Sequence, residues 1–222
     1  QGMVCHETYQ DENKKWLSPE EVTTEDGKNY YNKKNPSEKI IVGATESMSK
    51  SKRNTIDPEE IIKNYGADAV RLFILSDSPP EKDVQWSEQG MVASYKFIQK
   101  FWTMHQKILI KTNNQNKNKL KNFNENLEEF TNQIINKINI SLDKFSYNVI
   151  IANLHEVYNF LQKRVEDANI NKSFINNYIK ILKIMIPIVP HLSMECLSEV
   201  SADKIFSWPE IDKKYLQNKI YN

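Results

Sequence analysis

The sequence is poor in residues that mark several classes of protein. Cysteine occurs only at Cys5 and Cys196, so neither a disulfide framework nor a cysteine metal site is indicated, and a reducing cytoplasm is expected. The five glycines include no G-x-G-x-x-G spacing, which argues against the common glycine-rich nucleotide loops. No apolar run approaches the roughly 20 residues that span a bilayer, so no membrane role is expected.

An excess of charge of one sign is also missing. Thirty basic side chains balance 29 acidic ones, for a net charge of +1, so bulk charge does not predict DNA or RNA as a partner. Any nucleic-acid site must come from local clustering of cations. Hydrophobic residues make up 39% of the chain, enough for a packed core. The chain starts at Gln1 without the zones of a secretory signal, and we expect it to be cut from a longer protein.

Short extended runs separated by turn signals fill residues 1–46. The pair Asp26-Gly27 lies between two such runs, and this pair is a strong signal for a β-hairpin. The sequence therefore predicts a small β-rich N-terminal part.

The pattern becomes helical at Asp57. Asp57 suits an N-cap, Pro58 suits the first helical position, and Gly66 suits the left-handed residue that ends a helix. A second short helix is predicted over residues 68–75, before the two prolines at 79 and 80. The two helices make up a predicted connector over residues 57–86.

Longer amphipathic helices are predicted from Ser87 onward. Residues 111–124, dominated by Asn and Lys, lose the periodicity and are predicted to be a linker. The fold class is therefore mainly α, with an antiparallel helical bundle over residues 87–222. The apolar stripes recur every three or four residues: Met91, Tyr95, Ile98, Trp102 and Leu109; Leu127, Phe130, Ile134, Ile138 and Leu142; Ile150, Leu154, Val157, Leu161 and Val165; Ile175, Tyr178, Leu182 and Met185. Phe206 and Trp208 are predicted to pack the tail onto the bundle.

Three cations and three hydroxyls lie together in residues 47–54 (SMSKSKRN), immediately before the capped helix. Lysine ammonium groups, serine hydroxyls and backbone N–H groups near a helix start can all hold phosphate oxygens. A solvated charged loop is the competing interpretation of the same residues.

A longer string favours the phosphate site. Residues 48–54 (MSKSKRN), 57–58 and 65–71 (YGADAVR) closely resemble the K-M-S-K-S loop and the following helices of class I aminoacyl-tRNA synthetases. Residues 79–87 (PPEKDVQWS), 2–4, 190–192 and 208–210 resemble the bacterial leucine enzymes of that class. One departure is clear, since Ser47 stands where the family motif has its first lysine.

The resemblance implies a fold and a site. Residues 1–56 would be the end of a nucleotide-binding catalytic domain, and residues 87–222 an anticodon-binding domain. ATP, carrying Mg²⁺ on its phosphates, would be bound by Met48, Ser49, Lys50 and Ser51, with Lys50 as the catalytic residue. The implied activity is the ATP-dependent activation of leucine and its transfer to tRNA(Leu), by a cytoplasmic monomer.

The tRNA contacts are less specified by the sequence. Lys52, Arg53 and Arg71 are candidates for binding the tRNA backbone, and Arg71 could equally pair with a nearby acid. His105 has no metal-ligand partner one helical turn away, so no metal site is expected there. A packed or capping role is favoured for His191.

Other functions stay open at this point. The His-x-Gly-His signature that forms the other half of class I active sites is absent from this sequence, so the chain alone is predicted to be inactive. A noncatalytic tRNA-binding module, a helical scaffold, or a synthetase for methionine, valine or isoleucine are the alternatives. Sequence upstream of Gln1, or an amino-acid panel in pyrophosphate exchange, would discriminate among them.

Overall fold

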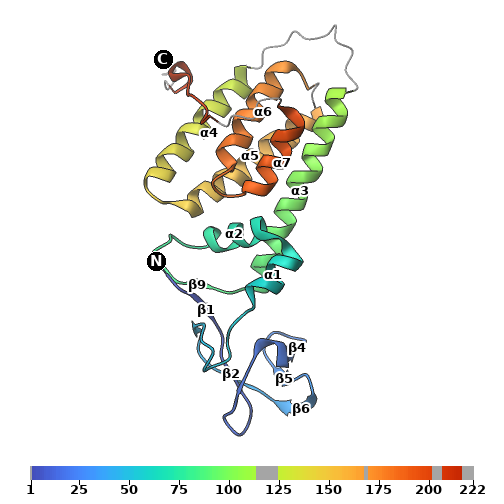
Figure 1. The fold of residues 1–222 in the computed structure, drawn as a ribbon, viewed down its shortest axis with the longest axis vertical. Helices are drawn as coiled ribbons and strands as arrows, with labels where there is room; N and C mark the ends of the chain where they lie inside the picture. The colour runs from blue at the N-terminus through green and yellow to red at the C-terminus, as the bar shows by residue number, and fades with distance from the viewer. Residues whose placement is uncertain (1, 114–124, 168–169, 202–206, 217–222) are drawn as a thin grey trace.

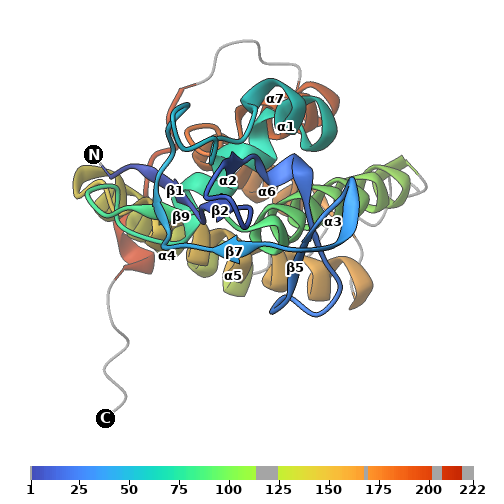
Figure 2. The same ribbon diagram turned by 90° about the horizontal axis from the view of Figure 1, so that it is seen from below.

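The computed structural model describes residues 2–113, 125–167, 170–201 and 207–216 (Figure 1). A bundle of helices forms one end of the molecule, small β-sheets form the other, and a pair of short helices lies between them (Figure 1). Seen from below, the strands lie in front of the helical part (Figure 2). The predicted mainly α fold with a small β-rich N-terminal part is confirmed.

The β-rich part consists of three small sheets, with strand orders β8-β1-β9, β3-β2-β7 and β4-β5-β6. The predicted hairpin at Asp26-Gly27 joins β4 to β5, with Gly27 at a positive φ of 67°. Asp26 Oδ1 accepts hydrogen bonds from the N–H groups of Asn29 and Lys28, and these bonds lower the pKa of Asp26 to about 2. The strands are β1 Val4–His6, β2 Tyr9–Gln10, β3 Trp16–Leu17, β4 Val22–Thr24, β5 Tyr30–Asn32, β6 Asn35–Lys39, β7 Ile41–Val42, β8 Glu46–Ser47 and β9 Val84–Gln85.

The connector contains the two predicted helices, α1 Pro58–Tyr65 and α2 Ala67–Ser76. The Asp57 carboxylate caps α1 by accepting a hydrogen bond from Glu59 N at 2.9 Å, as its sequence position predicts. Gly66 separates the helices with a φ of 80°, a backbone conformation that side chains disfavour. The chain therefore turns between α1 and α2 within a single residue.

The bundle is formed by α3 Glu88–Asn113, α4 Glu125–Asp143, α5 Tyr147–Asp167, α6 Lys172–Met185 and α7 Pro190–Val200. Ser87 caps α3, because its Oγ accepts a hydrogen bond from Gly90 N at 3.1 Å. The predicted linker begins too early, since residues 111–113 belong to α3; residues 114–124 lie outside the described residues. In the tail, Trp208 Nε1 donates to Asn139 Oδ1 at 2.9 Å, whereas Phe206 lies outside the described residues.

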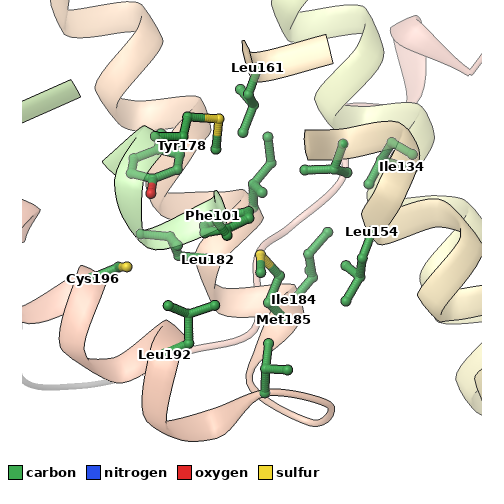
Figure 3. Close-up of a cluster of buried hydrophobic side chains, with 14 of the residues drawn as sticks. Phe101, Ile134, Leu154, Leu161, Tyr178, Leu182, Ile184, Met185, Leu192 and Cys196 are labelled. Atoms are coloured by element: carbon green, nitrogen blue, oxygen red, sulfur yellow. The ribbon is translucent and has the colours of Figure 1, made fainter. Parts of the chain in front are cut away.

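The bundle core contains the apolar stripes predicted for α4, α5 and α6, and Figure 3 shows part of it around Phe101, Leu154 and Tyr178. The stripe predicted for α3 is partly wrong. Met91 of this stripe is fully buried, but Trp102 and Leu109 are only partly buried, and the other fully buried positions of α3 lie on the adjacent face. Both faces are apolar, and the periodicity alone does not tell which one meets α5, α6 and α7. The residues that α3 contributes to this core are Phe97, Phe101, Met104 and Ile108.

A polar group crosses this core. His105 of α3 is fully buried, and its Nδ1 lies 3.0 Å from Tyr178 Oη while its Nε2 lies 2.8 Å from Glu199 Oε2. Burial lowers the pKa of His105, an effect that Glu199 opposes. The ring thus joins α3 to α6 and α7 by hydrogen bonds, as a packed histidine does.

Candidate functional site

The loop formed by residues 48–54, termed the lysine loop, starts where strand β8 ends. β8 pairs with β1 in an antiparallel register that places Cys5 opposite Ser47, and Met48 N donates to Val4 O at 3.2 Å. Asp57, the third residue after the loop, caps α1. The lysine loop is therefore held between a sheet and a helix start, as its sequence position predicts.

The side chain of Asn54 connects the two ends of the lysine loop by a hydrogen bond. Its side chain is fully buried, its Oδ1 accepts from Ser49 N at 2.8 Å, and its Nδ2 donates to His6 O at 3.2 Å and Glu46 O at 3.3 Å. One amide thus joins the start of the loop to strands β1 and β8.

Hydrogen bonds between residues of the loop itself also stabilise the turn. Arg53 N donates to Lys50 O and Lys52 N donates to Ser49 Oγ, both at 3.3 Å. The hydroxyls of Ser49 and Ser51 also lie 3.3 Å apart. Arg53 has a φ of 55°, in the left-handed region, which allows the backbone to turn sharply immediately before Asn54.

The three cations of the lysine loop have different surroundings. Lys52 Nζ pairs with Glu46, and Arg53 Nη1 lies 3.0 Å from Glu21 Oε2 and 3.3 Å from Trp16 O. Lys50 is exposed, and within the described part of the chain its ammonium has no ion pair or hydrogen bond. Lys50 is thus the cation of this loop that is available to an anionic ligand.

Glu21, the acid that pairs with Arg53, also has a fixed position. Glu21 accepts a hydrogen bond from Ser18 N at 2.9 Å, and this bond, followed by the charge of Arg53, lowers the pKa of the Glu21 carboxyl. The carboxylate is therefore ionised where it meets the guanidinium. Contact of Lys52 or Arg53 with an RNA phosphate would require each cation to leave or share its acid.

The sequence did not reveal the roles of Asn54, Glu46 and Glu21. Asn54 belongs to the string that carries the family resemblance, but an asparagine that ends a charged loop gives no sign of being buried. Glu21 lies more than thirty positions away from Arg53 in sequence. The ion pair of Glu46 with Lys52 depends on how the loop folds back after β8, which the sequence does not show.

Two other cations of the chain, Arg71 and Lys111, donate hydrogen bonds to backbone carbonyls. Arg71 donates from Nη2 to Pro187 O at 2.7 Å and from Nε to Ile188 O at 3.0 Å, so its partners here are backbone carbonyls rather than the nearby acid considered above. Lys111, assigned by its sequence to a linker, donates to Val165 O and Glu166 O at the end of α5. His191 is exposed, and its Nδ1 lies 2.9 Å from Asp68 Oδ1.

A cleft of about 650 Å³ lies beside the loop, between the β4–β5 hairpin and the helices α1 and α3. Its walls include His6, Tyr65 and Trp86, but none of residues 48–53. The cleft is thus separate from the free ammonium of Lys50. Within the described ranges, no group of three His, Cys, Asp or Glu residues has the arrangement of a metal site. A search of the same residues for a helix long and apolar enough to cross a membrane finds none.

Comparison with known families agrees with this geometry. The family model of tRNA synthetases class I (I, L, M and V) matches residues 28–87, which contain the lysine loop and the connector. The model of the anticodon-binding domain of tRNA ligase matches residues 124–221, which contain α4 to α7. The chain therefore belongs to the class I aminoacyl-tRNA synthetases.

Within this class, the chain is a member of the leucine-tRNA ligase family, as its sequence resemblance predicts. The leucine-tRNA ligase of Orientia tsutsugamushi (strain Boryong) is 37% identical over 224 residues, covering 99% of this chain and 26% of that protein. That of Wolbachia pipientis subsp. Culex pipiens (strain wPip) is 36% identical over 224 residues, covering 97% of this chain and 26% of that protein. The chain thus spans about a quarter of the length of these relatives.

A solved structure shares the fold. It is the ternary complex of Agrobacterium radiobacter K84 agnB2 LeuRS with tRNA and LeuAMS, with a TM-score of 0.65 and 21% identity. The match covers 77% of this chain and 23% of that one. At this identity the likeness concerns the architecture alone.

Proposed function

We propose that this chain is the part of a leucine-tRNA ligase that contacts the phosphates of ATP and binds the tRNA. Residues 1–56 would complete the catalytic domain, residues 57–86 would connect it to the bundle, and residues 87–222 would bind the anticodon arm. The observation that supports the catalytic part best is the free ammonium of Lys50 on a loop whose other cations are both paired.

In the proposed reaction, a carboxylate oxygen of leucine attacks the α-phosphorus of ATP. The bond from that phosphorus to the bridging oxygen breaks, and pyrophosphate leaves with additional negative charge. The ammonium of Lys50 would neutralise this charge, while the backbone and hydroxyls of Ser49 and Ser51 would hold the phosphates. Because Asn54 fixes the turn before ATP arrives, little reorganisation would be needed. Leucine would then pass from the adenylate to a ribose hydroxyl of the terminal tRNA adenosine.

Mg²⁺ is expected to accompany ATP rather than to occupy a site of its own in this chain. The lysine loop offers hydroxyls and one free ammonium, and its neighbouring carboxylate, Glu46, is paired with Lys52. Hard divalent ions prefer carboxylate and phosphate oxygens. The phosphates of ATP would therefore hold the ion in this part of the site.

Substitution of Lys50 tests the proposed role. Lys50→Ala in the full-length ligase is expected to slow leucine-dependent exchange of pyrophosphate into ATP by about 10² to 10³, the usual cost of removing one preorganised charge-stabilising donor. Lys63→Ala, on the exposed surface of α1, is the matched control and should leave the exchange rate unchanged. An unaltered exchange rate in Lys50→Ala would reject the assignment.

The bundle is proposed to bind tRNA(Leu) through backbone and shape contacts, and Lys52 and Arg53 of the lysine loop are further candidate phosphate ligands. Arg71 is not proposed as a phosphate ligand, because its guanidinium is bonded to the carbonyls of Pro187 and Ile188. The solved structure is a complex of LeuRS with tRNA and LeuAMS, which supports tRNA and a leucyl substrate as partners. We further propose a cytoplasmic monomer without a DNA partner. A panel of leucine, methionine, valine and isoleucine in the same exchange assay tests the amino-acid specificity, and a preference for any but leucine would overturn it.

A further inference from the structure

Helix α2 meets one turn of the bundle through two oppositely charged side chains. Asp68 and Arg71 are three positions apart, so they lie on the same face of α2. Both contact the segment that joins α6 to α7, more than a hundred residues further along the chain. Figure 1 shows α2 between this bundle and the strands below it.

Asp68 acts as the N-cap of α7 from another helix. The residue at the N-cap position is Val189, which has no side-chain cap bond, and Pro190 has no N–H group. The buried Asp68 carboxylate instead accepts from Leu192 N at 2.7 Å with Oδ2 and contacts His191 Nδ1 at 2.9 Å with Oδ1. A carboxylate at a helix start satisfies free N–H groups and is stabilised by the helix dipole.

Arg71 binds the carbonyl side of the same turn. Its guanidinium donates to Pro187 O at 2.7 Å and to Ile188 O at 3.0 Å. The planar guanidinium reaches both carbonyls at once, which a lysine ammonium does not do with the same geometry. One face of α2 thus offers an acceptor to the N–H groups of the turn and a donor to its carbonyls.

The other side of α2 is linked to the lysine loop. α1 begins three residues after the loop, and only Gly66 separates α1 from α2. Ile61 and Tyr65 of α1 pack on the buried Ala69 and Phe73 of α2 in one cluster. After α2, Gly2 N donates to Pro80 O and Val84 N donates to Met3 O, which ties the segment to strand β1 and so to β8. Fixed contacts therefore run from the lysine loop through α2 to the α6–α7 turn.

We propose that Asp68 and Arg71 are positioning residues that set the orientation of the lysine loop relative to the tRNA-binding bundle. This inference rests on the proposed function. A tRNA held by the bundle would then present its acceptor end to the site in one fixed register. Activation of leucine needs no tRNA, so it does not depend on this orientation, whereas transfer of leucine to tRNA does.

The test uses two charge-removing variants in the full-length ligase: Asp68→Asn, which conserves the size of the side chain, and Arg71→Gln, which shortens it. Leucine-dependent pyrophosphate exchange is expected to stay within about twofold of the wild-type rate. The kcat for tRNA leucylation is expected to fall about tenfold to a hundredfold, the effect of a displacement of roughly 1 Å between reacting groups, with KM for tRNA nearly unchanged. Asp77→Asn, an exposed acid at the end of α2, is the matched control.

Two results would overturn the inference. Leucylation at the wild-type rate in both variants would show that Asp68 and Arg71 do not position the loop. A parallel loss of exchange and leucylation would show that these residues support the loop or the fold rather than its orientation. Thermal melting checks that the variants fold. If Asp68→Asn unfolds, Arg71→Lys, which keeps the charge but lacks the planar guanidinium, is tested by the same rates of pyrophosphate exchange and tRNA leucylation. A wild-type protein without leucine-dependent exchange would instead refute the proposed function itself.

Discussion

Replacement of Asn54 tests whether the lysine loop is held closed from inside. Asn54→Ala removes one acceptor and two donors, and leaves Ser49 N, His6 O and Glu46 O without this partner. Each net hydrogen bond contributes about 1 kcal/mol, so the closed turn should lose about 3 kcal/mol. Since 1.4 kcal/mol corresponds to a factor of ten, the population of the closed loop relative to open forms should fall roughly a hundredfold.

The assays separate the loop from the rest of the chain. In the full-length ligase, Asn54→Ala is expected to lower kcat/KM for ATP in pyrophosphate exchange, because Lys50 is no longer held at the phosphates. Binding of tRNA to the bundle, measured by a gel shift, is expected to be unchanged. Thr55→Ala, at the exposed neighbouring position, is the matched control and should behave as wild type.

Asn54→Asp makes the test sharper. Aspartate keeps an acceptor for Ser49 N but replaces the amide donor with a carboxylate oxygen that faces His6 O and Glu46 O. Repulsion between these oxygens should make Asn54→Asp at least as impaired as Asn54→Ala. Wild-type exchange by Asn54→Asp would refute the reasoning, since it would mean that the two donated bonds do not hold the loop.

Two predictions concern stability of the chain and can be checked by urea unfolding. Phe145 lies two residues after the end of α4, has a φ of 53° and is mostly exposed, so Phe145→Gly should stabilise the chain by about 1 kcal/mol; a loss of stability would contradict this. Burial holds the pKa of His105 below its ordinary value of 6.5, so the unfolded chain takes up this proton first. Stability should therefore fall as the pH drops below about 6.5, and His105→Gln should flatten that dependence; an equal slope in the variant would show that His105 is not its source.

The helices were predictable because their signals are local. The Asp57 cap, the Gly66 break and the Ser87 cap each depend on a few neighbouring residues, and each is present in the structure. The apolar stripes of α4, α5 and α6 were also correct, since each of these helices has one dominant apolar face. α3 has two, and only its packing against three other helices selects the stripe through Phe101.

Several contacts that fix the site were not predictable in this way, because they join residues that are distant in sequence. Asp68 caps a helix that starts more than a hundred residues later, and the sequence around Val189 and Pro190 offers no cap of its own. An N-terminal helix turn without a local cap is a signal that some other segment must supply one. That signal gives the need for a partner but not its identity.

The cations show what this limit means for function. A sequence reveals a positive charge but not whether an internal acid or carbonyl already neutralises it, and Lys52, Arg53 and Arg71 all have such partners within the chain. Lys52 and Arg53 stabilise the loop, and Arg71 stabilises the contact of α2 with the α6–α7 turn. An RNA phosphate would therefore have to compete with these internal groups for the cations. Lys50 has the same charge but is exposed, on a loop whose other two cations are paired. Its availability is therefore a property of the fold, and for this reason the effect of Lys50→Ala should exceed that of Lys52→Ala on pyrophosphate exchange, although the two residues are two positions apart.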